Sequence, residues 1–230
     1  GVAGGDRRLC IVRLLALLGA QDVPRPAPRV AQASASLKDH PRLFGPKSWL
    51  QSRAKEKPEL YKDVKATKEL LPAVLTFAIE GLDGKEIDVA LALLMKKVAA
   101  GPTNAHQDTW IALHDAAIAY DGFHEAIAPK DRQAIIDWMN AHLGSFTEDE
   151  NAFHNSTLSK IMAYVRVAVA TWNDNPKAKE FRDRAIGKLY EGKIVPVLLE
   201  FGAGGGFTEA GWYSKHAVWH LVQALETLRR

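Results

Sequence analysis

The sequence is poor in cysteine, with one residue, Cys10, among 230. A single thiol can form no internal disulfide and no multi-thiolate metal site. Any nucleophile or ligand set must therefore come from other side chains. No pattern of metal-ligating residues stands out, so we expect a protein without a metal or a redox cofactor.

The sequence also lacks clustered charge of one sign. The formal net charge is +3, and lysine and arginine are interleaved with aspartate and glutamate along the chain. This pattern argues against a nucleic-acid-binding surface, which needs basic residues gathered on one face. An anionic small or polymeric substrate remains open. The apolar run 9–20 is too short to span a bilayer, so no membrane span is expected.

Residues 1–38 differ from the rest of the chain. Arg7 and Arg8 precede the apolar run 9–20, and small residues follow at 31–35. This order is typical of an export signal and predicts a periplasmic or secreted protein. Arg13 interrupts the apolar run, so the alternative is a short helix followed by a disordered leader.

From residue 39 onward the apolar spacing is helical, and the alternating pattern of strands is nearly absent. Proline and glycine divide the pattern into helices. These are expected at 46–71, 72–80, 83–100, 106–121, 129–144, 155–172, 176–190, 194–201 and 213–229. The fold class is therefore all-α, built from helical hairpins. The last helix has an apolar stripe that needs partners on more than one side, which predicts truncation at the C-terminus.

A glycine-rich stretch begins the region with the densest chemistry. Residues 202–206 contain four glycines in five positions, which suit unusual backbone dihedrals or close approach of a ligand. Acid, base and aromatic side chains follow directly: Glu209, Trp212, Tyr213, His216 and His220. Such a set is typical of a polar ligand site. The alternative is a loop between two helices whose aromatic residues simply pack.

A second polar cluster lies at 151–157, just before the most apolar helix. Asn155 or Ser156 is expected to be the N-cap, which places His154 at the positive end of the helix dipole. A carboxylate would be attracted to that position. The alternative is that the amide and hydroxyl groups only cap the helix and His154 is an exposed loop residue.

Several motifs together resemble a known family. They are His40-Pro41-Arg42-Leu43, Ala119-Tyr120-Asp121, the run from Ile127 to Arg132, Phe153-His154-Asn155-Ser156, Gly205-Gly206-Phe207-Thr208-Glu209 and Gly211-Trp212-Tyr213. In order and spacing, residues 39–230 resemble the helical toroid domain of heparinase II/III-like and alginate-lyase-like polysaccharide lyases. The resemblance implies an incomplete (α/α) toroid with a groove for an acidic polysaccharide or oligosaccharide. It also implies a C-terminal β-sandwich domain that is missing from this chain.

The chemistry implied by the resemblance is β-elimination beside a uronic acid. By motif, His154 matches the histidine that neutralises the uronate carboxylate, and Tyr213 matches the tyrosine that transfers protons. Many members place asparagine directly before that histidine, but this chain has Phe153, so the neutralising amide is Asn151 or Asn155. A second acid/base residue typically follows beyond the length of this chain, which puts the activity of the fragment in doubt.

Four further residues are candidates for substrate binding. Glu209 could bind sugar hydroxyls, Trp212 could stack on a sugar ring, Gly206 would allow a sugar to approach the backbone, and His114 could line the groove. For each of them a structural role is the alternative. Trp212 would then belong to the core, Glu209 would be solvated and His114 would be a core or surface histidine.

Two other functions remain open at this point. A toroid glycoside hydrolase would use Glu209 with a second carboxylate across the groove, for which Asp108, Asp115 and Asp121 are conceivable. A non-catalytic glycan-binding helical domain would keep the groove without the chemistry. His216 and His220 have the four-residue spacing of a metal pair, but no glutamate stands between them and no third ligand is evident. We interpret this pair as packing or supporting residues.

Overall fold

The computed structural model describes residues 40–43, 47–66, 70–81, 84–101, 106–146, 154–201 and 212–229. Within these ranges all regular structure is helical and no strand occurs, which confirms the all-α prediction. The leader predicted for residues 1–38 lies outside the described residues. None of the described helices has the length and apolar character needed to cross a membrane.

The helices follow the predicted order closely. They are α3 (Lys47–Glu56), α4 (Pro58–Ala66), α5 (Leu70–Glu80), α6 (Gly84–Ala99), α7 (His106–Gly122), α8 (Pro129–Gly144), α9 (Asn155–Ala170), α10 (Ala178–Asp183), the π-helix η1 (Arg184–Ile194), α11 (Val195–Phe201) and α12 (Trp212–Arg229). The single helix predicted over 46–71 is wrong, because the chain breaks at Lys57 and restarts at Pro58. Proline lacks an N–H and clashes inside a helix, but it fits the first turn.

The helix predicted over 176–190 is also divided. It begins as α10 and changes at Arg184 to η1, which continues into α11. Gly187 and Gly192 both lie in η1, and a Cβ built on Gly192 would stand 3.2 Å from the carbonyl oxygen of Gly187. The absence of a side chain at Gly192 therefore suits the wider π-helical winding.

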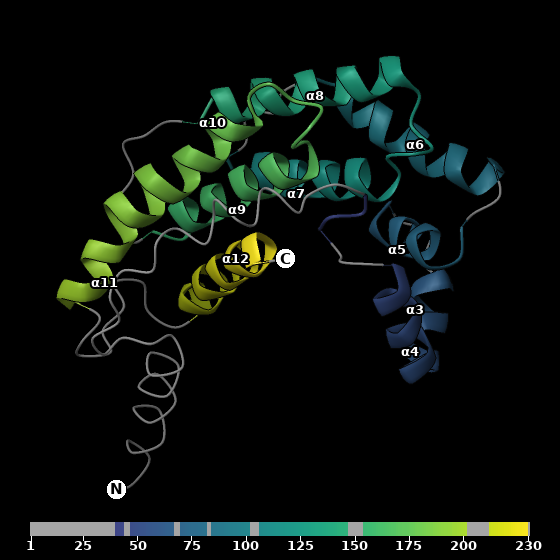
Figure 1. Cartoon of the computed structure of the whole chain (residues 1–230), viewed down its shortest axis with the longest axis horizontal. Helices are drawn as coiled ribbons and strands as arrows, with labels where there is room; N and C mark the ends of the chain where they lie inside the picture. Colours follow the sequence, from purple (N-terminus) through teal and green to yellow (C-terminus); the bar gives the residue numbers. More distant parts are fainter. Residues whose placement is uncertain are drawn as a thin grey trace, which may run out of the picture.

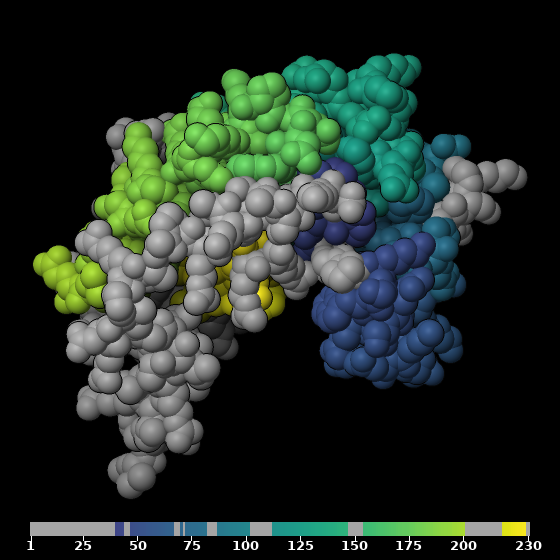
Figure 2. All heavy atoms as spheres, in the orientation of Figure 1, coloured from purple at the N-terminus to yellow at the C-terminus, as the bar shows by residue number. Residues whose placement is uncertain are grey.

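The helices form two layers along an arc (Figure 1). α6, α8, α10 and α11 lie on the outside of the arc, and α5, α7 and α9 lie inside it. α9 packs against α7 within the inner layer, against α10 and η1 in the outer layer, and against α12 on its remaining side. α3 and α4 pack on α5 at the far end of the arc. In the space-filling view the molecule is hollowed between α12 and the pair α3 and α4 (Figure 2).

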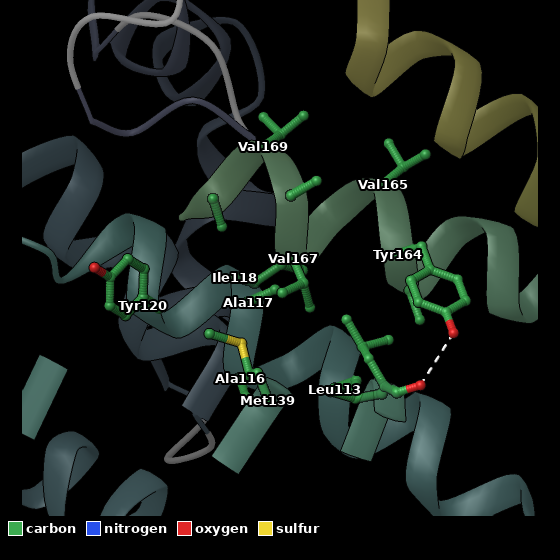
Figure 3. Close-up of a cluster of buried hydrophobic side chains, with 14 of the residues drawn as sticks. Leu113, Ala116, Ala117, Ile118, Tyr120, Met139, Tyr164, Val165, Val167 and Val169 are labelled. Carbon is green, nitrogen blue, oxygen red and sulfur yellow. Dashed lines mark hydrogen bonds between the residues drawn. The ribbon is translucent and has the colours of Figure 1, made fainter. Parts of the chain in front are cut away.

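The centre of the core is α9, in which every residue from Ser156 to Ala170 is buried. The apolar face predicted for 106–121 packs beside it, and Leu113, Ala117 and Tyr120 have no exposed surface. Figure 3 shows these residues with Met139 of α8 and the valines of α9. Full burial of one such large side chain contributes about 1.5–3 kcal/mol, so this cluster supplies much of the driving force for folding.

The short segment 40–43 is held against both α7 and α9. The Asp121 carboxylate of α7, which is fully buried, accepts hydrogen bonds from His40 Nδ1 at 2.6 Å, from the Arg42 backbone N–H at 2.8 Å and from the Leu43 backbone N–H at 2.6 Å. The Arg42 side chain donates to the carbonyl of Ala170 at 3.1 Å, at the C-terminus of α9. A cation suits that helix end because its last carbonyls lack partners within the helix.

Candidate functional site

The two faces of α9 have different surroundings. Tyr164 faces the outer layer, where its hydroxyl donates to the Leu143 carbonyl of α8 at 3.0 Å and its ring contacts Phe181 of α10. Figure 3 shows Val165 on a different side of α9 from Tyr164 and nearer α12. At 3.6 residues per turn, residue 166 lies about 200° round the helix from residue 164. Arg166 is therefore on the inner face of α9.

Asn155, Ser159 and Arg166 share this inner face, because their spacings of four and seven residues return to the same side of a helix. Ser159 contacts His220 of α12, and Arg166 contacts His114 of α7 and Gln223 of α12. We call these six residues the polar stripe. The stripe joins three helices, α7, α9 and α12, on the side of α9 that faces away from the outer layer.

The N-terminal part of the polar stripe is centred on Ser159. Its hydroxyl lies 2.8 Å from the Asn155 carbonyl and 2.7 Å from Nδ1 of His220. Since the single hydroxyl proton goes to the carbonyl, His220 donates its Nδ1–H to Ser159. His220 is buried. The interpretation of His220 as a packing or supporting residue stays a prediction.

The C-terminal part of the polar stripe is centred on Arg166. Its Nη1 donates to Nε2 of His114 at 2.8 Å, and its Nη2 donates to Oε1 of Gln223. Arg166 is 9% exposed, and burial lowers the pKa of its guanidinium to about 10, so it stays charged at neutral pH. No carboxylate in the described part of the chain forms a salt bridge with it.

His154 stands at the N-terminal end of the same helix. It is itself the N-cap of α9, and its Nδ1 accepts from the backbone N–H of Ser156 at 3.3 Å. The prediction that Asn155 or Ser156 is the cap is therefore wrong by a residue or two. Because Nδ1 acts as an acceptor, the proton of neutral His154 is on Nε2, where it can be donated. The ring is exposed, and Asn155 beside it is half-buried.

The remaining predicted site residues are only partly described. Asn151, Gly206 and Glu209 lie outside the described residues, and Trp212 and Tyr213 are placed only as backbone, in the first turn of α12. Ser159 contacts His220, and Arg166, which is further along α9, contacts Gln223, which is further along α12. The two helices therefore run in the same direction where they pack. The start of α12 is therefore directed toward the end of α9 that His154 caps.

A second cluster of titratable residues lies beside the segment 40–43. The imidazole rings of His40 and His124 stack at 3.6 Å with 10° between their planes. His124 Nε2 lies 2.9 Å from Asp174 Oδ2, which also accepts from the Tyr120 hydroxyl at 2.7 Å. Burial and the neighbouring His40 lower the pKa of His124. Burial would raise the pKa of Asp174, but the hydrogen bonds from Tyr120 and His124 outweigh it and hold this pKa below its usual range.

His40, His124 and Asp174 bring three ligand-type atoms within 4.8 Å of one another. A metal ion bonds to imidazole in the plane of the ring, and two rings stacked face to face cannot both offer their nitrogens to one ion in that way. Arg132 Nη1 also lies 3.1 Å from His124 Nε2 and would repel a cation. The cluster as it stands suits a structural role, holding segment 40–43 to the turn after α9.

Sequence reasoning missed three of the six residues of the polar stripe, namely Ser159, Arg166 and Gln223. The available signal was the charge of Arg166 within the apolar second half of the helix, since a buried arginine almost always has partners. His124 and Asp174 could not be paired from the sequence either, because they are 50 positions apart. No protein-family model, curated protein or solved structure matches the chain.

Proposed function

We propose that this chain is the helical part of an exported polysaccharide lyase that cleaves a uronic-acid-containing glycan by β-elimination. We also propose that its two-layered arc of hairpins is part of an incomplete (α/α) toroid (Figure 1). The observation that carries the proposal is the polar stripe with His154 at its end. It combines an exposed histidine that can donate from Nε2 with a buried guanidinium that lacks a carboxylate partner among the described residues.

The reaction needs three actions from the protein. The uronate carboxylate must be neutralised by hydrogen-bond donors, so that the carbanion formed at C5 is stabilised. A base must remove the C5 proton, and the glycosidic oxygen at C4 must leave with a proton as the C4–O bond breaks. The C5–H electron pair becomes the C4–C5 double bond, so no oxidant, reductant or water is consumed.

His154 suits the first action because its Nε2–H is a neutral donor at the N-terminus of α9, where the helix dipole attracts an anion. The amide of Asn155 or Asn151 would complete the neutralisation. Tyr213 is proposed to transfer both protons. Its place in the first turn of α12, which is directed toward the His154 end of α9, supports this assignment.

The test is to incubate the chain with alginate, heparan sulfate and other uronic polymers and to follow ultraviolet absorbance and product mass. A lyase leaves a C4–C5 unsaturated uronide that absorbs in the ultraviolet and is lighter by one water than the product of hydrolysis. New reducing ends without unsaturation would instead identify a hydrolase. Binding of the glycan without either product would identify a non-catalytic glycan-binding domain, and both results would reject the lyase proposal.

A further inference from the structure

The two ends of the polar stripe are too far apart to hold the same acidic group. Arg166 lies about 16 Å from Asn155 along α9, at 1.5 Å per residue. Even if the Arg166 side chain leans one turn toward the N-terminus, as helical side chains do, about 11 Å remains. Met162, which is 1% exposed, lies between them on the same face. The stripe therefore contains two separate polar regions.

Arg166 is arranged as an anion-binding group. Arginine carries five N–H donors in a planar fork that matches a carboxylate, and two of them are used by His114 and Gln223. Both of these partners are neutral, because His114 accepts through Nε2 and Gln223 accepts through its amide oxygen. No carboxylate of the described residues forms a salt bridge with Arg166. A ligand carboxylate bound by the remaining donors would therefore supply the negative charge.

The partners fix the direction of the fork. His114 comes from α7 and Gln223 from α12, so the guanidinium is held between the two helices on the inner face of α9. His114 was expected to bind substrate; its Nε2 is engaged with Arg166, which makes it a positioning residue. The 9% of Arg166 that stays exposed is the surface through which a ligand oxygen would reach it.

We propose that Arg166 is a specificity-determining residue that binds the carboxylate of a second acidic sugar, remote from the sugar whose carboxylate His154 neutralises. The inference rests on the proposed lyase function and adds a requirement to it. A productive substrate must carry a second carboxylate about two to three helical turns of α9 away from the one at the cleavage point. Oligosaccharides too short to reach Arg166 are handled without it.

The experiment compares the chain with Arg166→Gln, Arg166→Lys and the control Arg53→Gln, an exposed arginine on α3. The substrates are uronic oligosaccharides of increasing length, from the shortest that is cleaved. For long substrates, Arg166→Gln is expected to raise KM by roughly 10- to 100-fold with little change in kcat, as loss of a charge-assisted contact predicts. Arg166→Lys keeps the charge but not the planar fork of donors, so its KM should lie between those of the unaltered chain and Arg166→Gln. The shortest substrate and the control should show no change.

A KM for long substrates that is unchanged in Arg166→Gln overturns the inference, and so does an equal rise at every length. Neither result affects the lyase proposal. A second measurement works without a variant: carboxyl-reduced oligosaccharides are titrated against the unaltered chain, with the native acidic oligosaccharides as reference. Equal affinity for both refutes the anion subsite even if no unsaturated product forms. Tighter binding of the acidic form supports the subsite, and the missing product would then reject only the lyase.

Discussion

Replacing Asp121 by alanine removes the carboxylate that fastens segment 40–43 to α7. Three groups donate to this carboxylate, namely His40 Nδ1 and the backbone N–H groups of Arg42 and Leu43. Asp121 has no exposed surface, so water cannot replace it without rearrangement. In the variant, two backbone donors and one imidazole donor would lose their acceptor.

The magnitude follows from these contacts. Each hydrogen bond to a charged group contributes about 1.5–3 kcal/mol, and three independent bonds would give more than about 4 kcal/mol. The three bonds share one carboxylate and are not additive. We therefore expect a loss of about 3–5 kcal/mol in the free energy of unfolding, as when one partner of a buried ion pair is removed. For a chain of this size the melting temperature should fall by roughly 6–20 °C.

The assay is urea unfolding followed by circular dichroism and tryptophan fluorescence. Asp137→Ala is the matched control, because Asp137 is exposed on α8 and bonds only to Gln133 of its own helix; its effect should stay within about 0.5 kcal/mol. His40→Ala removes one donor and should cost about 1.5–3 kcal/mol. If Asp121→Ala loses less than about 1 kcal/mol, the argument that this carboxylate fastens the segment is refuted.

Three other measurements test the remaining assignments. Tyr213→Phe should abolish formation of the unsaturated product while glycan affinity stays nearly unchanged. The control Tyr190→Phe, in η1, should change neither product formation nor affinity. Undiminished turnover in Tyr213→Phe would show that Tyr213 does not transfer the proton. Burial lowers the pKa of His142, so the unfolded chain binds this proton more readily, and stability should drop as pH falls through the ordinary histidine pKa of about 6.5 and below it. His142→Phe should flatten that pH dependence, and an equally steep dependence in the variant would contradict this origin. Ser159→Ala leaves the Nδ1–H of His220 without its acceptor and should cost about 1–3 kcal/mol in urea unfolding; no loss would mean that water replaces the hydroxyl.

The helices could be predicted from the sequence because their signals are local. Pro129 and Gly144 mark the ends of α8, and the structure places α8 between those two residues. The errors arise where a local signal was overridden or overlooked. Pro58 starts a new helix inside a segment that was predicted as one helix, and the π-helical winding of η1 leaves no mark in the spacing of apolar residues.

The candidate site could be predicted only in part. His154 was located by its position before an apolar helix, and its place at the start of α9 is confirmed. Its functional role stays a prediction, as do the roles of Asn151, Asn155 and Tyr213. Arg166 could not be assigned from the sequence, because its partners His114 and Gln223 are 52 and 57 positions away. Contacts of that kind depend on how the helices pack, which apolar spacing does not encode.

The fastening of segment 40–43 has a consequence for the order of folding. Its contact with Asp121 spans 81 positions and its contact with Ala170 spans 128. A ribosome synthesises this segment long before either partner, so it must wait until α7 and α9 have left the exit tunnel. Closing such long loops is slow compared with pairing neighbouring helices. The inner helices would therefore associate first, and segment 40–43, although it is made before them, would dock after them.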